Sequence, residues 1–537
     1  MLAAILYLLF FLSGVSGLVY QVVWVRAFGT VFGNTVYSSS IVVAIFMLGL
    51  GVGGYVAGRW SDRRYTTAPD SLLRAYGCAE LLIAVMALGV CLSVPSLGPI
   101  AARSSSYVAD ARGWFVLSPF SYLARGAIAF GLVGPVAFVM GATLTLLVRH
   151  LVRRDVESAG AWKIALLYGL NTLGAATGAF LTDYLLVPSS GLRATQLAAV
   201  ALNVVAGVGA LALAHRRQTS PAVRSNTRSA AIPPSGSPAT IVWTCVALTM
   251  SGFAAMGMEI VWLRHFTLLL GSFRAVFSLV MTVVLVGIGA GALVGPVFAR
   301  LAARPAEALM ALLAFFVCAV LSGLAFARFP VAETRSALTA WSWTDDLWHN
   351  LRPILLEAGV PCFLIGCSYP LGNAVIQHAE ATVGRRAGAL YLANTLGAVV
   401  GSLIAGFVLL PMLGMQGSAS VLMLAAGLAI VPLAFTIPAS RAKSVLAAAS
   451  LMVVVSALGA WLRLPPDYVV RQAMAPRFAG ERSLALSEGV NETIEVREAP
   501  GRGRGLLTNG HPMSSTAWLD QRYMRALAHV PLLSLDH

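Results

Sequence analysis

An acidic side chain, Glu259, lies at the centre of the apolar stretch SGFAAMGMEIVWLR, residues 251–264. At helical spacing it shares one face with Ser251, Ala255 and Trp262. A charge at membrane depth is costly and usually faces the interior of a helix bundle or a water-filled cavity. This pattern therefore predicts an inward-facing carboxylate that binds a proton or a cation.

A purely structural role is the alternative for Glu259: its carboxyl would be hydrogen-bonded between helices, to Asn171 or Asn394. These asparagines belong to two similar segments, YGLNTLGAATG beginning at Tyr168 and YLANTLGAVVG beginning at Tyr391. The GxxxG spacing of the glycines in each segment favours close packing of helices. The tyrosines and asparagines have a second interpretation, as the lining of a central cavity.

The composition places these residues in a lipid bilayer. Of the 537 residues, 58% are hydrophobic and only 11% are charged, whereas a soluble chain carries roughly 25% charged residues. Repeated apolar runs of about 20 residues predict a polytopic helical membrane protein and exclude a soluble multidomain protein. The net charge of +15 comes mostly from short loops, so it argues for membrane topology and contact with anionic lipids and against nucleic-acid binding.

The predicted fold class is all-α, with a small β-rich piece at the C-terminal end. The apolar runs indicate six helices in residues 1–214, a flexible cytoplasmic linker at 215–240, six helices in 241–437, an extra transmembrane helix at 444–462, and a polar tail at 463–537. Loops on the side of the N-terminus hold 18 Arg and Lys residues, against 10 on the other side. The positive-inside rule therefore predicts an inner-membrane protein with a cytoplasmic N-terminus.

The two groups of six helices form an internal repeat. SGVSGLVYQVVWVR, residues 13–26, is a near copy of the stretch around Glu259, with Gln21 in place of the glutamate. LGLGVG at 48–53 matches VGIGAG at 286–291, and FVMGATL at 138–144 matches FLIGCSY at 363–369. Since six is an even number, both halves enter the membrane in the same sense. We expect two parallel repeats, with a binding site at their interface.

The tail has a different pattern. NETIEVREAPGRGRGLLTNGHPMSST alternates apolar and polar residues around glycine-rich turns, which predicts a β-hairpin or a small meander. WLDQRYMRALAHVPLL follows, with apolar residues at helical spacing, which predicts a short amphipathic helix. The six cysteines of the chain show no metal-ligand spacing with histidine. The residues therefore predict neither a metal site nor a bound cofactor.

Several segments resemble a known family. In GRWSDRR, Gly58, Asp62 and Arg63 resemble the cytoplasmic loop motif of major-facilitator transporters, the alternative being a solvated basic loop. Together with the stretches FLSGVSGLVYQVVWVR and YGLNTLGAATGAF, this segment resembles the helices of bacterial membrane proteins that fuse a major-facilitator-like region to a spermidine-synthase-like domain. The tail from 488 onward resembles the N-terminal β-domain and linking helix of the synthase part.

This resemblance implies a polyamine aminopropyltransferase that uses decarboxylated S-adenosylmethionine, bound by a Rossmann-like domain after the linking helix. Of the synthase pattern in the tail, Gly510, Asp520 and Tyr523 are kept, whereas the glutamine, the histidine and the second acid are not. The glycine-rich donor loop is not found within these 537 residues, so we expect no donor site and no catalytic residue in this chain. Thirteen helices would also place the tail on the outer side, away from a cytoplasmic donor.

Three functions are therefore compatible with the sequence. The first is a membrane-anchored, spermidine synthase-like protein of which this chain holds the membrane region and the start of the synthase domain. The second is a major-facilitator-like secondary transporter of a polyamine or another amine or cation, with a vestigial or docking tail. The third is a scaffold without transport activity.

Overall fold

The computed structural model describes residues 2–32, 36–109, 113, 115–152, 161–218, 237–271, 274–302, 304–328, 342–377, 382–437, 441–474, 480–489, 492–501 and 503–534. In this part of the chain, 10 helical stretches are long and apolar enough to cross a membrane. The prediction of a polytopic all-α fold is confirmed.

The first half of the bundle follows the expected order of helices, with a short β-hairpin that the sequence did not predict. Its elements are α1 (Leu2–Phe32), α2 (Val36–Thr67), α3 (Ser71–Ser93), α4 (Leu97–Arg103), β1 (Tyr107–Ala109), β2 (Phe115–Leu117), α5 (Pro119–Leu151), α6 (Ala161–Leu181), the π-helical η3 (Thr182–Leu186) and α7 (Val187–Gln218).

The second half repeats this order and ends in an added helix. Its elements are α8 (Pro238–Leu270), α9 (Arg274–Leu301), α10 (Pro305–Phe326), α11 (Trp343–Gly366), α12 (Ser368–Ile376), α13 (Val383–Ile404), the π-helical η5 (Ala405–Leu409), α14 (Leu410–Leu428), α15 (Ile430–Ala434), α16 (Arg441–Trp461) and α17 (Tyr468–Ala473).

Two of the 10 stretches turn back on themselves at a glycine. Gly191 in α7 and Gly414 in α14 have positive φ angles of 76° and 64°, outside the helical region, so each stretch contains two helices rather than one. Both glycines follow a π-helical segment and a proline, at matching places in the two halves. The two helix breaks therefore occur at equivalent positions, as expected for an internal repeat. The domain boundaries drawn from the sequence remain a prediction.

Helices pack closely where the GxxxG segments predicted it. A Cβ atom added at Gly174 or Gly178 of α6 would overlap a backbone carbonyl oxygen of α1. A Cβ atom added at Gly397 or Gly401 of α13 would overlap a carbonyl oxygen of α8 in the same way. The prediction of close helix packing is confirmed in both halves.

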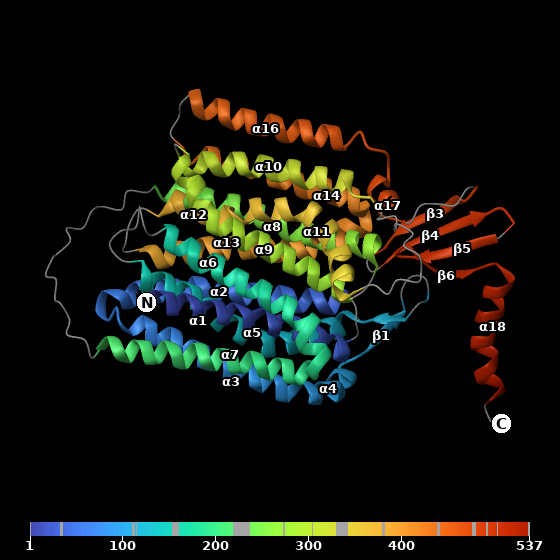
Figure 1. The fold of residues 1–537 in the computed structure, drawn as a ribbon, viewed down its shortest axis with the longest axis horizontal. Coiled ribbons are helices and arrows are strands. Elements are labelled where there is room, and N and C mark those ends of the chain that lie inside the picture. Colours follow the sequence, from blue (N-terminus) through green and yellow to red (C-terminus); the bar gives the residue numbers. More distant parts are fainter. Residues whose placement is uncertain are drawn as a thin grey trace.

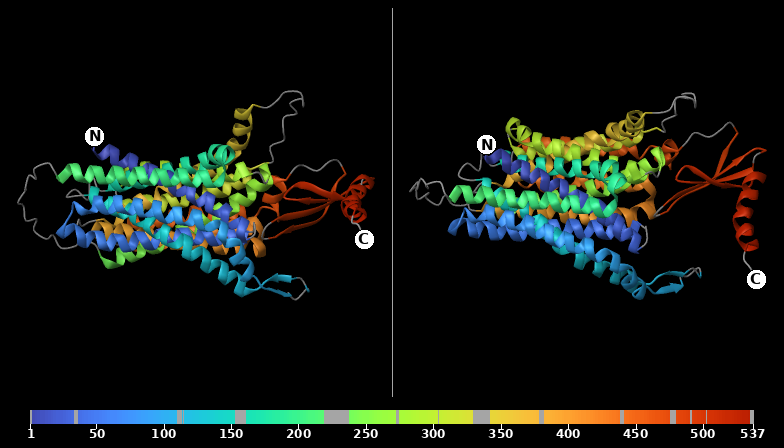
Figure 2. Two further views of the ribbon diagram at one scale, coloured as in Figure 1. Left: turned by 90° about the horizontal axis from the view of Figure 1, so that it is seen from below. Right: turned by 60° about the horizontal axis from the view of Figure 1, so that its bottom comes forward.

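The N-terminus and the C-terminal sheet lie at opposite ends of the bundle (Figures 1 and 2). The sheet is an antiparallel meander in the order β3 (Arg482–Glu488), β4 (Thr493–Ala499), β5 (Gly503–Thr508) and β6 (His511–Ser515), which confirms the predicted β-rich piece. Asn509 and Gly510 both have positive φ angles in the turn between β5 and β6, as a two-residue hairpin requires. The last described element is α18 (Trp518–Leu533), none of whose side chains is buried.

The sheet is anchored on the second half of the bundle. The Arg264 guanidinium of α8 donates to the Gly489 carbonyl and to the Thr493 hydroxyl, each at 3.2 Å. The Glu488 carboxylate accepts the Met415 backbone N–H at 2.9 Å, directly after the break at Gly414. These contacts attach the end of β3 and the start of β4 to α8 and α14.

Candidate functional site

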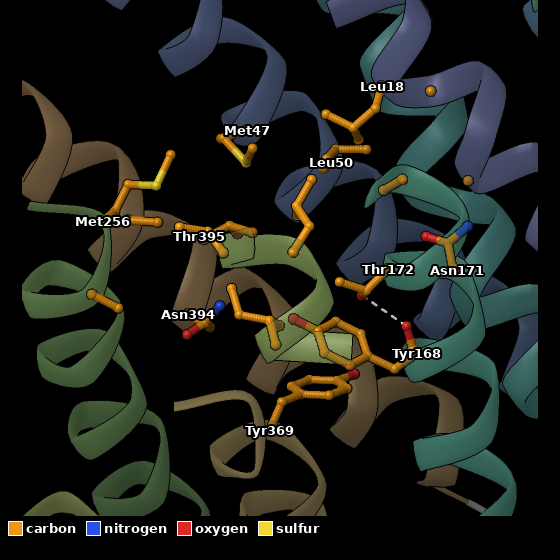
Figure 3. Close-up of a pocket in the computed structure, with 18 of the residues that line it drawn as sticks. Leu18, Met47, Leu50, Tyr168, Asn171, Thr172, Met256, Tyr369, Asn394 and Thr395 are labelled. Atoms are coloured by element: carbon orange, nitrogen blue, oxygen red, sulfur yellow. Dashed lines mark hydrogen bonds between the residues drawn. The ribbon is translucent and has the colours of Figure 1, made fainter. Parts of the chain in front are cut away.

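A cavity of about 240 Å³ lies between the two halves, lined by residues of α1, α2, α5 and α6 from the first half and of α8 to α13 from the second. The six intramembrane residues predicted from the sequence all line it: Gln21, Tyr168, Asn171, Glu259, Tyr391 and Asn394. The labelled side chains in Figure 3 show Asn171 and Asn394 on different helices around this space. The tertiary structure thus brings together residues that are more than a hundred positions apart.

Glu259 is the one charged residue among the described residues that line the cavity. Only 8% of it is exposed, and within the described chain no hydrogen bond or ion pair reaches its carboxylate. The predicted alternative, a hydrogen bond to Asn171 or Asn394, is not formed there. Asn171 instead donates to the Phe10 carbonyl of α1 at 3.1 Å. The cavity therefore contains an acidic group without a compensating charge from its described walls.

Gln21 lies on α1 at the position that Glu259 has on α8. It is 3% exposed, and its Oε1 atom accepts no hydrogen bond from the described residues. Neighbouring Trp24 and Tyr20 stack at 5.1 Å between ring centroids, and Trp262 holds the matching place beside Glu259. The two halves thus present an amide and a carboxyl group from equivalent helices.

Three tyrosines form an aromatic cluster in the wall of the cavity. The ring centroids of Tyr168 and Tyr369 are 4.7 Å apart, and those of Tyr369 and Tyr391 are 6.1 Å apart. Figure 3 shows the rings of Tyr168 and Tyr369 facing each other. Tyr369 was not predicted from the sequence, although it ends the segment FLIGCSY, which has a matching segment in the first half. Its hydroxyl donates to the Ala387 carbonyl at 3.2 Å, which ties α12 to α13.

The GRWSDRR segment joins the two halves away from the cavity. The Asp62 carboxylate accepts the backbone N–H groups of Gly384 and Arg385 at 3.0 Å and 2.7 Å, at the start of α13. It also pairs with Arg149 of α5 at 3.0 Å. A carboxylate at a helix N-terminus accepts hydrogen bonds from the free backbone N–H groups of the first turn. Its negative charge also interacts favourably with the positive end of the helix dipole.

The other two predicted residues of this segment differ in their surroundings. Gly58 lies so close to the Gly384 carbonyl that a side chain would not fit, whereas Arg63 is exposed. The alternative of a solvated loop therefore describes Arg63 but not Gly58 and Asp62. Near the other end of the bundle, Asp183 of η3 pairs with Arg26 and accepts the Ser278 hydroxyl of α9.

The synthase-like residues of the tail lie apart from the cavity, at the end of the molecule shown in red in Figure 1. Gly510 forms the turn between β5 and β6, and Asp520 accepts the Ser515 hydroxyl at the start of α18. Tyr523 is 63% exposed. In the described chain these three residues have structural contacts or face outward, and their origin as a synthase-like remnant remains a prediction.

Two further buried carboxyl groups were not predicted from the sequence. Glu80 of α3 is fully buried, and its Oε2 accepts the Asn203 side-chain amide of α7 at 2.6 Å. Glu357 of α11 lies 3.1 Å from His265 of α8, both being buried. Each interrupts an apolar run, which is the signal that identified Glu259. Among the described residues, His, Cys, Asp and Glu form no group of three that would hold a metal ion.

Comparison with solved structures identifies the fold. The outward-facing structure of FucP, a major facilitator superfamily transporter, matches with a TM-score of 0.50 and 15% identity over 81% of this chain and 98% of that chain. The outward-facing structure of a bacterial homologue of the iron transporter ferroportin, with soaked iron, matches with a TM-score of 0.50 and 14% identity over 80% of this chain and 98% of that chain. The helical bundle has the major-facilitator fold. It is therefore a multi-pass membrane domain.

Comparison of sequences gives a second, weaker similarity. No family model matches the chain. The protein described as polyamine aminopropyltransferase 1 of Streptomyces coelicolor (strain ATCC BAA-471 / A3(2) / M145) is 27% identical over 221 residues, which are 41% of this chain and 36% of that protein. The chain thus spans about a third of the length of this curated relative. The similarity is in line with the resemblance drawn from the sequence, and the fusion itself stays a prediction.

Proposed function

We propose that this chain is a secondary transporter of the major-facilitator type that carries a small organic cation, an amine, across the inner membrane. The observation that carries the proposal is the Glu259 carboxylate, buried in the cavity between the halves without a compensating charge from the described walls. In a medium of low dielectric constant such a group gains most from binding a cation or a proton.

The rest of the cavity supports an amine with an apolar part. Its walls are mostly apolar, with methionines and aromatic rings around a few amides and hydroxyls. The faces of Tyr168, Tyr369, Tyr391 and Trp262 offer cation–π contacts to an ammonium group. One carboxylate matches one positive charge, so a monoamine fits this cavity better than a polyamine does.

We further propose that the N-terminus lies in the cytoplasm, as the distribution of loop arginines supports. The sheet β3–β6 would then lie on the outer side, since it and the N-terminus are at opposite ends of the bundle (Figure 1). In this orientation the Asp62 contacts join the halves on the cytoplasmic side and the Asp183 contacts join them on the outer side.

Uptake by proteoliposomes tests the proposal. With an imposed pH gradient, the wild-type protein should accumulate at least one labelled monoamine from a panel that also contains spermidine. Glu259→Gln should reduce amine binding about tenfold or more, because a hydrogen bond to a charged group contributes roughly 1.5–3 kcal/mol. Glu307→Gln is a matched control, since Glu307 pairs with Arg304 at 3.8 Å outside the cavity. If the wild-type and Glu259→Gln proteins took up the labelled amine equally well, the proposed role of this carboxylate would be wrong.

A transferase role is the second candidate, favoured by the similarity to the aminopropyltransferase and by the sheet and helix of the tail. In that case the bundle would anchor a spermidine synthase-like enzyme whose donor, decarboxylated S-adenosylmethionine, binds to a Rossmann-like domain of the complete protein. Donor-dependent transfer of an aminopropyl group by the full-length gene product would favour this function. Amine uptake without any such transfer would favour the transporter.

A further inference from the structure

A second buried acid lies in the first half of the bundle, one layer behind the cavity. Glu80 of α3 has no exposed surface. Its Oε2 atom accepts the Asn203 amide of α7 at 2.6 Å, and the hydroxyl groups of Ser13 and Tyr76 also lie beside its carboxyl group. A carboxylate that is buried there with only neutral groups around it is strongly disfavoured. A proton on Oε1 removes the charge, and the Ser13 oxygen beside the carboxyl group can accept a hydrogen bond from it.

The surroundings of Glu80 contain hydroxyl groups and no positive charge from the described chain. Tyr76, one turn earlier on α3, and Tyr20 of α1 are the titratable groups that face it. Helix α5 also packs against α3, but its arginines do not pair with Glu80. Arg125 donates to the Phe32 carbonyl and to the Ser105 hydroxyl. Its Arg149 pairs with Asp62, and the arginines of α7 lie near the two ends of that helix. The charge of Glu80 is thus not balanced by a neighbouring base.

Ser13 connects this acid to the cavity. It lies on α1 beside the Glu80 carboxyl and also lines the cavity wall. On the same helix Gln21 takes the place that Glu259 has in the second half. The second half therefore holds its acid in the cavity wall, whereas the first half holds an acid behind that wall, with a serine hydroxyl between the acid and the cavity.

We propose that Glu80 is a second proton-binding site of the transporter, which exchanges its proton with the cavity through the Ser13 hydroxyl. The proton leaves Oε1 for the Ser13 oxygen, while the hydroxyl proton of Ser13 passes to water or to an amine in the cavity. Glu80 is then a carboxylate, held by the hydrogen bond from Asn203. Protonation from the cavity reverses these steps. The proposal rests on the proposed transport function, to which it adds a proton-coupling site.

Infrared spectroscopy of the protein in proteoliposomes tests the proposal without any substrate. The C=O stretch of a protonated carboxyl group should be present in the wild type, disappear in Glu80→Gln and move in frequency in Glu80→Asp. It should persist in Glu259→Gln, which assigns it to Glu80. In D2O the band should shift as the proton exchanges, and it should lose intensity as the pH is raised. Ser13→Ala should slow this exchange by about a hundredfold, since a positioned group accelerates proton transfer by 10²–10⁴.

Two results would overturn the proposal. The first is a spectrum in which no protonated carboxyl band responds to either substitution of Glu80. The second is a Glu80 band that neither exchanges in D2O nor changes with pH, which would make Glu80 a purely structural group. Because the readout needs no substrate, it stays informative if no amine is transported. If Glu80→Gln does not fold, the Glu80→Asp and Ser13→Ala proteins answer the same question.

Discussion

Glu80, Glu259 and Glu357 are three buried carboxyl groups in one helical bundle, and their surroundings differ. Glu80 accepts a hydrogen bond from the Asn203 amide of α7, and the Glu357 carboxyl group lies 3.1 Å from the imidazole of His265 on α8. Glu259 faces the cavity without a hydrogen bond from the described residues. A buried acid with a partner holds helices together, whereas one without a partner in a cavity is available for a ligand. This difference is why Glu259 carries the proposed function.

The His265–Glu357 pair leads to a prediction about stability. Since both side chains are buried, removing one partner leaves the other without compensation. We expect His265→Ala or Glu357→Ala to lower the free energy of unfolding by about 3–5 kcal/mol. Replacing both residues by leucine should cost less than the sum of the two single changes. Unfolding in mixed micelles, followed by circular dichroism, measures these differences.

The pair of exposed Arg304 and half-buried Glu307, 3.8 Å apart, is the control for this prediction. Glu307→Ala should change the free energy of unfolding by less than about 1 kcal/mol, as is usual for surface ion pairs. If the single changes at His265 and Glu357 had equally small effects, the buried pair would not stabilise the bundle.

At the scale of elements, α8 connects the functional parts of the second half. It contributes Glu259 to the cavity, His265 to the contact with α11, and Arg264 to the contact with the C-terminal sheet. Its other side packs closely on α13 through Gly397 and Gly401. The position of the carboxylate in the cavity therefore depends on how closely α8 and α13 approach each other.

Substitution at this contact should separate the two helices. In Gly397→Ala the new Cβ atom would overlap the Thr249 carbonyl oxygen of α8. We expect a loss of about 1–3 kcal/mol in the free energy of unfolding, as for other overpacked contacts. Gly89→Ala in α3 is the control, because no atom lies within 4 Å of its added Cβ. A neutral Gly397→Ala protein would contradict the close packing.

At the scale of the whole molecule, the C-terminal sheet is joined to the second half of the bundle by a half-buried acid, Glu488. Burial raises the pKa of the Glu488 carboxyl above its ordinary value of 4.5, although the Met415 N–H and the Arg264 guanidinium act in the opposite direction. A carboxyl with a raised pKa in the docked state binds its proton more tightly there than in the free tail. The contribution of Glu488 to docking is therefore most favourable below pH 4.5 and declines as the pH rises through the raised pKa.

Hydrogen exchange at the docking contact tests this pH dependence. After correction for intrinsic exchange rates, protection of the segments around Met415 and Thr493 should fall as the pH rises above 4.5. Glu488→Gln, which stays neutral, should remove this dependence. Glu498→Gln is the control, since Glu498 pairs with Arg504 at 3.2 Å on the open side of the sheet. A dependence that persists in Glu488→Gln would show that another group controls docking.

Sequence patterns alone predicted the membrane helices, the parallel repeat, the close helix packing and six of the residues that line the cavity. They did so because long apolar runs have few stable alternatives in lipid, and because repeated motifs fold into equivalent positions. Glu259 could be placed inward from its helical face alone, since a charge facing lipid is costly. The amphipathic pattern likewise predicted α18, but not that its apolar residues would stay exposed in the described chain.

Only the tertiary structure decided which buried groups are paired. The contacts of Glu80 with Asn203, of Glu357 with His265, and of Asp62 with the start of α13 join residues that are far apart in the sequence. Pairing depends on the rotation and separation of packed helices, which side-chain packing fixes and a one-dimensional pattern does not contain. The sequence by itself determined where acids stand in apolar helices, and packing decided that Glu259 is the one that faces the cavity.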